Sequence, residues 1–456
     1  MRISETILSV ALLFGTTQAQ QPAPDNTVTR AVALGVDPEI AATIASIKAF
    51  DNHAHPVLPP PADKSDRNFD ALPVDNMEPQ TDIVARRLDN PQLLDAWHAL
   101  WGFDPPKLPL DADGMKQLEA ARQHIKTREA THFDEWVLDQ SNIATQAANR
   151  VSLDTGVMPP RFLWVPYIDA LLFPLDNSAL ANTPDKKLFF PLEEKLRAQY
   201  LAASGLKSIP PTLADYLTQV VTPTLQRHKT NGAIGEKFEV AYLRNFDFTN
   251  VSLEDATSIY AKEYAKGASR KSLDPAEYKL LQDFLFRYIA QECGHLGLAV
   301  HLHTMSGGGG YFGISGGNPM LLEPLFNDPT LRKTKFVMLH GGWPYVREAG
   351  SLLQKPNVYL DLSQQALTFP PRTLATWLRE WLETFPDKVL FATDGYPFSD
   401  AMGWEEATWI ASRNSRQALG LALTGMVQDG EISRPRAAEI AQMVLTGNAT
   451  NLYAKP

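Results

Sequence analysis

The sequence predicts an α/β fold in which eight parallel strands form a barrel with helices between them. Short apolar runs typical of buried strands recur along the chain, and segments of helical spacing separate them. Four of these runs end in histidine or aspartate, and a fifth contains a lysine. In barrels of this kind, side chains from the carboxyl ends of several strands meet at one face. The length of 456 residues suffices for one such barrel with insertions.

Eight segments are expected to be strands. The first, Lys48–His55, ends in a His-x-His pair, and Pro56 then ends the strand because it cannot donate to a ladder. The other expected strands are Asn149–Leu153, Phe162–Ile168, Ala233–Ala241, Gly297–His303, Lys335–His340, Asn357–Leu362 and Lys388–Asp394.

Two helical stretches interrupt the regular alternation. Residues from about 62 to 145 contain no convincing strand, and Leu93–Trp101, Asp113–Lys126 and Phe133–Ala148 have helical spacing. We interpret this stretch as a helical cap inserted after strand one. A second helical insertion is expected around residues 185–230, before the fourth strand. We therefore expect residues 20–456 to form a single (β/α)8 TIM barrel domain with these two insertions.

The N-terminus has the features of an export signal. Arg2 gives a short positive start, residues 7–14 are largely apolar, and Thr17-Gln18-Ala19 resembles a cleavage site. We expect residues 1–19 to be a signal peptide and the protein to be exported, either to the periplasm or outside the cell. The apolar run is short for a bilayer and no later stretch is long enough, so no membrane span is expected.

Composition excludes some partners. The formal net charge is -10 and no run rich in lysine or arginine occurs, which argues against a nucleic-acid partner. The single cysteine, Cys293, cannot form an intramolecular disulfide, and we expect it to be a small buried residue.

The residues at the strand ends are of the types that bind metal ions. His53 and His55 are two apart on a strand, so both side chains point to the same face. His303 and His340 each end an apolar run and are followed by glycines, and Asp394 ends a third run in the same way. Imidazoles and a carboxylate from separate strands can converge on one metal ion or on a pair.

The order His-x-His, Lys, His, His, Asp resembles the amidohydrolase superfamily of metal-dependent barrel hydrolases. The chain is most similar to its amidohydrolase-related branch (amidohydrolase 2), which also includes metal-dependent decarboxylases. The resemblance extends over about residues 48–455 and is most specific in 303–325, 339–348 and 389–397. It implies a divalent metal, expected to be zinc, and these metal ligands: His53, His55, Lys237, His303, His340 and Asp394.

Lys237 has two interpretations that decide the number of ions. In binuclear relatives this lysine is carboxylated and bridges two metals, and His340 would then bind the second ion. Alternatively, Lys237 pairs with a nearby acid such as Glu239, which shares its face of the strand. One ion would then be held by the other ligands, and His340 would be free to act as an acid or base.

The resemblance implies a metal-dependent hydrolase acting on a small molecule. Metal-activated water would attack an amide, ester or lactone-like carbonyl, with Asp394 and His340 as catalytic residues. Arg161, Trp343 and Arg347 are candidate substrate-binding residues. Two alternatives stay open: a mononuclear decarboxylase of a small carboxylic acid, and a catalytically silent barrel that binds a ligand. A homo-oligomer is compatible with the resemblance.

Overall fold

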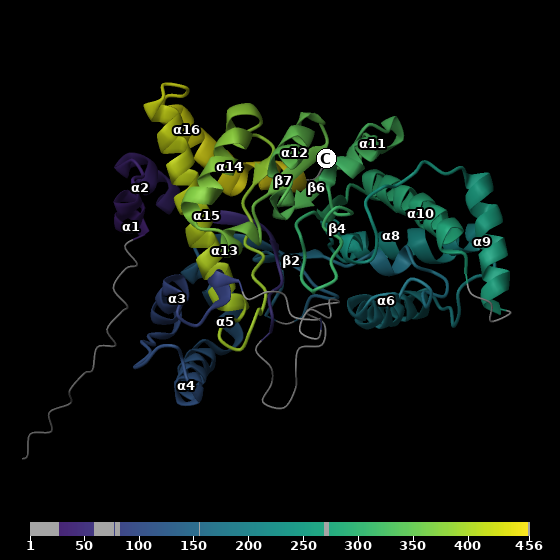
Figure 1. Cartoon of the computed structure of the whole chain (residues 1–456), viewed down its shortest axis with the longest axis horizontal. Helices are drawn as coiled ribbons and strands as arrows, with labels where there is room; N and C mark the ends of the chain where they lie inside the picture. The colour runs from purple at the N-terminus through teal and green to yellow at the C-terminus, as the bar shows by residue number, and fades with distance from the viewer. Residues whose placement is uncertain (1–26, 59–76, 78–82, 155, 269–272, 455–456) are drawn as a thin grey trace, which may run out of the picture.

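The computed structural model describes residues 27–58, 77, 83–154, 156–268 and 273–454 (Figure 1). Within these residues, the strands form two parallel sheets, with the orders β1-β2-β3 and β4-β5-β6-β7-β8. The strand order thus follows the chain order, as in a parallel barrel. The strands are β1 (Ala49–Ala54), β2 (Ile143–Asn149), β3 (Phe162–Val165), β4 (Gly235–Phe238), β5 (Ala299–His303), β6 (Phe336–Leu339), β7 (Val358–Asp361) and β8 (Val389–Leu390).

Backbone hydrogen bonds join the two sheets at both edges and close the ring. Between β3 and β4, the amide of Ile234 donates to the carbonyl of Trp164 at 3.0 Å. Between β8 and β1, the amide of Asp394 donates to the carbonyl of His53 at 2.8 Å. The expected parallel α/β barrel is therefore present.

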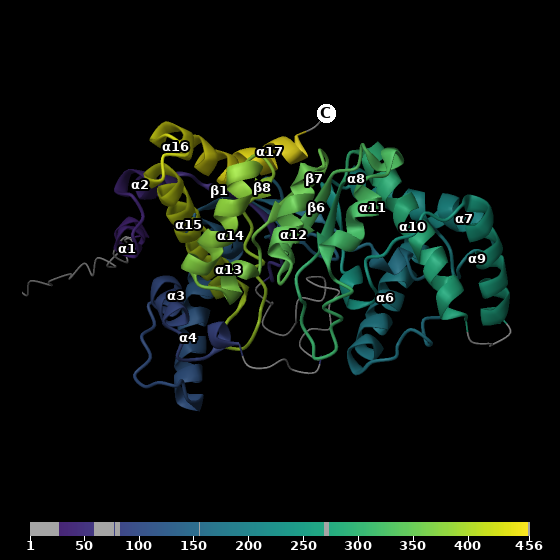
Figure 2. The same cartoon turned by 45° about the horizontal axis from the view of Figure 1, so that its top comes forward.

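Apolar side chains fill the amino end of the barrel. The helix α17 (Asn448–Tyr453) closes this end (Figure 2). Ala449 and Leu452 of this helix pack into the interior cluster. The other buried members of that cluster are Phe50, Ala147, Val165, Ala299, Val337, Leu339 and Leu390. Because this end is filled, only the carboxyl ends of the strands are free to form a site.

Helices surround the strands (Figures 1 and 2). Before β3 they are α1 (Thr27–Leu34), α2 (Pro38–Ser46), α3 (Pro91–Trp101), α4 (Ala112–Glu129) and α5 (Phe133–Gln140). Between β3 and β6 they are α6 (Pro184–Ala203), α7 (Leu213–Tyr216), α8 (Thr222–Thr230), α9 (Leu253–Ala268), α10 (Pro275–Leu296) and α11 (Glu323–Phe326). After β6 come α12 (Val346–Ser351), α13 (Gln365–Thr368), α14 (Pro371–Thr384), α15 (Trp404–Gln428) and α16 (Arg434–Gln442). Among the described residues, no helix has both the length and the apolar character needed to cross a bilayer.

The sequence sets the ends of these helices through ordinary capping. In α10 the side chain of Asp274 accepts hydrogen bonds from the first-turn amides, and Pro275 occupies the first helical position. The helix stops at Gly297, whose φ of 64° lies in the left-handed region that favours glycine. Gly297 thus turns the chain directly into β5, which carries His303.

The stretch between β1 and β2 contains α3, α4 and α5. These helices pack on the start of α15: Trp97 Nε1 donates to the carbonyl of Ala401 at 2.9 Å, and Arg122 pairs with Glu406 at 2.6 Å. Residues 59–76 and 78–82 of the expected cap lie outside the described residues. A role for this stretch in covering the site stays a prediction.

The expectation for the second strand is wrong. The predicted helix over Phe133–Ala148 ends at Gln140, and β2 occupies Ile143–Asn149 where helix was expected. Alanine-rich Ile143–Ala148 favours a helix by propensity, but pairing with β1 and β3 overrides it. In the predicted strand Asn149–Leu153, Asn149 is the last residue of β2 and the other four residues lie in the turn that follows. The boundary of the cap at residue 145 is wrong for the same reason.

Two further expectations concern the chain outside the barrel strands. Helices α6, α7 and α8 occupy residues 184–230 between β3 and β4, the stretch where a second helical insertion is expected. The expected signal peptide, residues 1–19, lies outside the described residues.

Candidate metal centre

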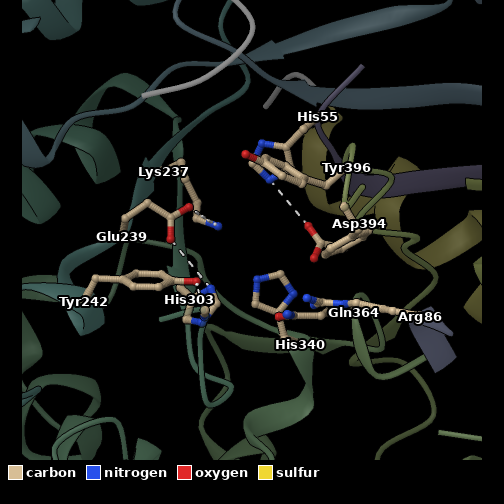
Figure 3. A pocket seen from close by; sticks show the side chains of 12 residues that line it. His55, Arg86, Lys237, Glu239, Tyr242, His303, His340, Gln364, Asp394 and Tyr396 are labelled. Atoms are coloured by element: carbon tan, nitrogen blue, oxygen red, sulfur yellow. Dashed lines mark hydrogen bonds and ion pairs between the residues drawn. The ribbon is translucent and has the colours of Figure 1, made fainter. Parts of the chain in front are cut away.

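The open end of the barrel holds a small pocket. Side chains from several strand ends point into it (Figure 3). The residues that line the pocket are His55, Arg86, Lys237, Glu239, Tyr242, His303, Gly308, His340, Gln364, Asp394, Tyr396 and Phe398. This convergence places polar and aromatic groups from distant parts of the sequence around one small space.

His53, His55 and Asp394 present three donor atoms with the spacing of metal ligands. His55 Nε2 lies 3.2 Å from His53 Nε2, and Asp394 Oδ1 lies 3.3 Å from His53 Nε2 and 3.4 Å from His55 Nε2. Ligands at about 2.0–2.1 Å around a tetrahedral zinc ion are about 3.3 Å apart. The two imidazole nitrogens and the carboxylate oxygen therefore fit a divalent ion.

His340 and His303 extend this cluster. Donor atoms of His53, His340 and Asp394 lie within 4.8 Å of one another, and all three residues are buried. The ring centroid of His303 is 4.5 Å from that of His340. Among the described residues, His303 Nε2 is buried and has no hydrogen-bond partner. A buried polar nitrogen is costly to leave unpaired, which makes it available to a ligand or ion.

Hydrogen bonds orient two of the imidazole rings. His55 Nδ1 lies 3.0 Å from the hydroxyl of Tyr167. His340 Nδ1 lies 2.7 Å from Ser363 Oγ, which donates to Asp361 Oδ1 at 2.5 Å. Burial raises the pKa of Asp361 to about 6, so near pH 7 it is largely ionised and accepts this proton. His340 Nδ1-H then donates to Ser363, which leaves His340 Nε2 with a free lone pair.

The protonation states suit metal binding. Burial lowers the pKa of His53 and His340 well below the usual range and that of His303 to about 3, so these rings are neutral near pH 7. Burial opposes the ionisation of Asp394. The ring of His340 and hydrogen bonds from His53 and His55 outweigh it and hold the pKa of Asp394 well below its usual range. Neutral imidazoles and a carboxylate are the forms that bind divalent ions.

Lys237 is paired with the acid that shares its face of the strand. Lys237 Nζ lies 2.7 Å from Glu239 Oε1 and 3.4 Å from His53 Nε2. Glu239 Oε2 is also 3.6 Å from His303 Nδ1. The lysine and the glutamate are both buried. A buried ion pair thus lies directly beside the histidine cluster.

The backbone is strained where the site residues leave their strands. His340, Gln364 and Asp394 have φ values of 69°, 55° and 54°, in the left-handed region that non-glycine residues rarely adopt. Each such residue costs about 1–3 kcal/mol and persists only where the surrounding structure imposes it. Strain of this kind gathers at functional sites, and here it turns all three side chains toward the pocket.

All six predicted metal ligands lie at or beside this pocket. Two predicted substrate-binding residues do not. Arg161 lies at the amino end of β3, and its side chain pairs with Asp139 at 3.1 Å. The side chain of Arg347 is 78% exposed and pairs with Glu380 at 2.6 Å. Trp343 follows His340 closely but is absent from the pocket lining. The expectation for both arginines is corrected, because each is engaged in an ion pair away from the pocket.

Sequence reasoning missed four residues of the pocket. Tyr242, Gln364 and Phe398 follow β4, β7 and β8 by a few residues, so their position after a strand end was a usable signal. Arg86 lies in a short 3-10 turn, Val84–Arg86, far from any strand end, and no local pattern indicates that it reaches the pocket.

Comparison with known proteins agrees with this arrangement. Residues 229–455 match the family described as Amidohydrolase. Protein fluG of Emericella nidulans is 30% identical over 229 residues, which make up 48% of this chain and 25% of fluG. The chain therefore spans about a quarter of the length of that relative.

Two solved structures share the fold. Uronate isomerase from Thermotoga maritima matches with a TM-score of 0.55 at 12% identity, covering 91% of this chain and 97% of that one. A protein described as a metal-dependent hydrolase from Lactobacillus casei matches with a TM-score of 0.54 at 16% identity, covering 90% and 96%. At such identities the likeness concerns the fold alone.

A parallel α/β barrel with buried histidines and an aspartate at its open end is the arrangement expected of a metal-dependent barrel enzyme. The chain belongs to the amidohydrolase family, in the group known as amidohydrolase 2.

Proposed function

We propose that this enzyme hydrolyses an amide, ester or lactone-like carbonyl of a small substrate with one divalent metal ion, most suitably zinc. The observation that carries the proposal is the spacing of the donor atoms of His53, His55 and Asp394, which are 3.2–3.4 Å apart at the pocket. A zinc ion bound there would polarise the carbonyl and lower the pKa of a water molecule. His340 and His303 are the further candidate ligands.

Asp394 and His340 are the proposed catalytic residues. Asp394 stays ionised and can accept a proton from the attacking water and pass it to the leaving group. His340 is held by Ser363 with its Nε2 lone pair free, so it can bind the ion or exchange a proton. Both residues line the pocket (Figure 3), within reach of a bound substrate.

The ion pair between Lys237 and Glu239 supports one metal ion over two. A bridging role would require Lys237 to be carboxylated, which turns a cation into an anion. The new anion would lie beside the buried carboxylate of Glu239, 2.7 Å from the present ammonium group. Two like charges in a buried site cannot both ionise without a large cost. Lys237 is therefore proposed to act as an unmodified cation.

Decarboxylation of a small acid is the second candidate function. Two observations favour it: the paired Lys237, and the cationic side chain of Arg86 in the pocket. The two reactions give different products, so each trial substrate should be assayed both for released bicarbonate and for a hydrolysed bond.

Metal content per chain is the experiment that tests the proposal. We expect one equivalent of zinc after reconstitution, its loss in His53→Ala and Asp394→Asn, and its retention in His98→Ala. His98 is a matched control because its side chain is 68% exposed and lies in α3. Failure to take up any divalent ion would contradict the proposal.

Intact mass distinguishes the number of ions. We expect no added carboxyl group in the presence of bicarbonate. Two ions, with a mass gain that disappears in Lys237→Ala, would instead show the binuclear arrangement.

We further propose that residues 20–456 form one domain and that residues 1–19 direct export. The mass of the mature protein from an exporting host tests the latter. A protein retained in the cytoplasm at full mass would contradict export.

A further inference from the structure

Arg86 is a cation in the pocket that has no ion-pair partner among the residues the structure describes. Its guanidinium lies over the ring of Phe398, 4.5 Å from the centroid. No carboxylate within the part of the chain that the structure describes comes within ion-pair distance of it. Two other arginines with little exposure do have ion-pair partners: Arg122 pairs with Glu406 and Arg244 with Asp283, each at 2.6 Å. Arg86 therefore has its positive charge available to a ligand.

The acids of the pocket are already occupied. Glu239 pairs with Lys237 at 2.7 Å, and Asp394 Oδ1 faces the two histidines of β1 at 3.3 and 3.4 Å. The negative charge of Asp394 favours the charged form of Arg86 from a distance, but the two side chains form no ion pair. If a divalent ion sits beside Asp394, that charge is neutralised as well. Arg86 is then the one side chain of the described pocket lining whose charge no neighbouring group balances.

Aromatic rings connect Arg86 to the metal-ligand cluster. The centroid of the Phe398 ring is 5.4 Å from that of Tyr396, and the Tyr396 centroid is 5.2 Å from that of His55.

Gln364 lines the same pocket, and its Oε1 is buried with no hydrogen-bond partner among the described residues. Figure 3 shows Arg86 and Gln364 entering the pocket on the side of His340 and Asp394. The pocket thus has a metal-ligand end, an aromatic wall and a cationic end.

We infer that the pocket binds a small carboxylate whose anionic group pairs with Arg86 and whose apolar part lies along Tyr396 and Phe398. The planar guanidinium fork matches a carboxylate through two parallel hydrogen bonds. Stacking on Phe398 fixes the plane of that fork before the ligand arrives. The inference deepens the proposed function and rests on it, since substrate and metal ion would lie side by side in one pocket.

Binding of benzoate to the zinc-loaded, full-length protein tests this inference, with benzamide as its neutral counterpart. By calorimetry, we expect benzoate to bind at least tenfold more tightly than benzamide. Arg86→Gln should lose at least tenfold in benzoate affinity, and Arg86→Lys should recover part of it because it restores the charge without the fork. Arg87→Gln is the matched control, because it removes the same charge from the exposed neighbour and should stay within twofold of the wild type.

Several outcomes would overturn the inference. These are equal binding of benzoate and benzamide, unchanged binding in Arg86→Gln, or no benzoate binding at all. Inorganic phosphate that binds through Arg86 more tightly than benzoate would also overturn the choice of a carboxylate. Metal content measured on the same samples keeps the two proposals apart. If the protein binds benzoate through Arg86 but retains no zinc, only the hydrolase proposal is contradicted. If the protein is fully loaded with zinc and Arg86→Gln does not change its affinity for benzoate, only the carboxylate inference is contradicted.

Discussion

Lys237 Nζ and Glu239 Oε1 lie 2.7 Å apart, and both side chains are buried at the floor of the pocket. The two residues sit two positions apart on one strand end, so their side chains share a face. Neither charge has access to bulk water, and each depends on the other.

Glu239→Gln should therefore destabilise the protein strongly. The substitution leaves the ammonium of Lys237 buried without its counter-charge, which typically costs about 3–5 kcal/mol. Urea unfolding of the metal-free protein measures this loss. Glu254→Gln, at an exposed position of α9, is the control. Equal stability of the two variants would show that Lys237 does not depend on Glu239.

Ser363→Ala should weaken metal binding more than it weakens the fold. His340 would lose the hydrogen bond at 2.7 Å that orients its ring. Loss of a hydrogen bond to a metal-binding histidine commonly costs about 10–100-fold in metal affinity. Competition with a chromogenic chelator measures the zinc affinity. Ser351→Ala, at an exposed position of α12, should leave it unchanged. An unaltered affinity in Ser363→Ala would mean that His340 is not a ligand.

Gly307→Ala should impair the pocket through Tyr242. A Cβ at Gly307 would lie 2.5 Å from the Tyr242 ring, which lines the pocket and is 4.8 Å from the ring of His303. The ring must move, and overpacking of this kind costs about 1–3 kcal/mol. We expect weaker benzoate binding and a lower unfolding temperature. Gly313→Ala in the same loop has open space for the added carbon and should behave as the wild type.

Asp95→Asn should destabilise the protein in a pH-dependent way. Asp95 on α3 accepts from Arg30 of α1 at 3.0 Å and from Arg413 of α15 at 2.9 Å. Burial raises its pKa, but the two guanidinium groups outweigh burial and lower the pKa below 3.8. A lowered folded-state pKa gives stability that is fully present above the unfolded value and disappears as pH falls through the folded value.

The difference between wild type and Asp95→Asn should thus be constant near pH 7, at about 1–2 kcal/mol, and shrink below pH 3.8. Urea unfolding of both proteins between pH 3 and 8 measures it. A difference that grows toward acid would contradict the assignment of the pair.

The metal-ligand residues could be predicted because each follows a strand in the sequence. A parallel barrel brings every strand's carboxyl end to one face, so the position after an apolar run fixes the location of His303, His340 and Asp394. The same rule places Arg161 at the opposite end of the barrel, because this residue precedes its strand.

Two features could not be read from local sequence. The strand β2 is rich in alanine, so its local sequence favours a helix, and only its pairing with β1 and β3 makes it extended. Arg86 reaches the pocket because its short turn is held near the loop after β8, where it meets Phe398. Contacts between such distant segments depend on tertiary packing, which a local pattern does not encode.

The closure of the barrel between β8 and β1 has a consequence for the integrity of the whole ring. Asp394 and His53 share a backbone hydrogen bond at this junction, as do Gly395 and His55, while β8 itself has only two residues. An ion held by His53, His55 and Asp394 would therefore act like a cross-link between the first and last strands. When the ion leaves, amide hydrogens at this junction should exchange with solvent before those of the other strand pairs, and the barrel should open there first.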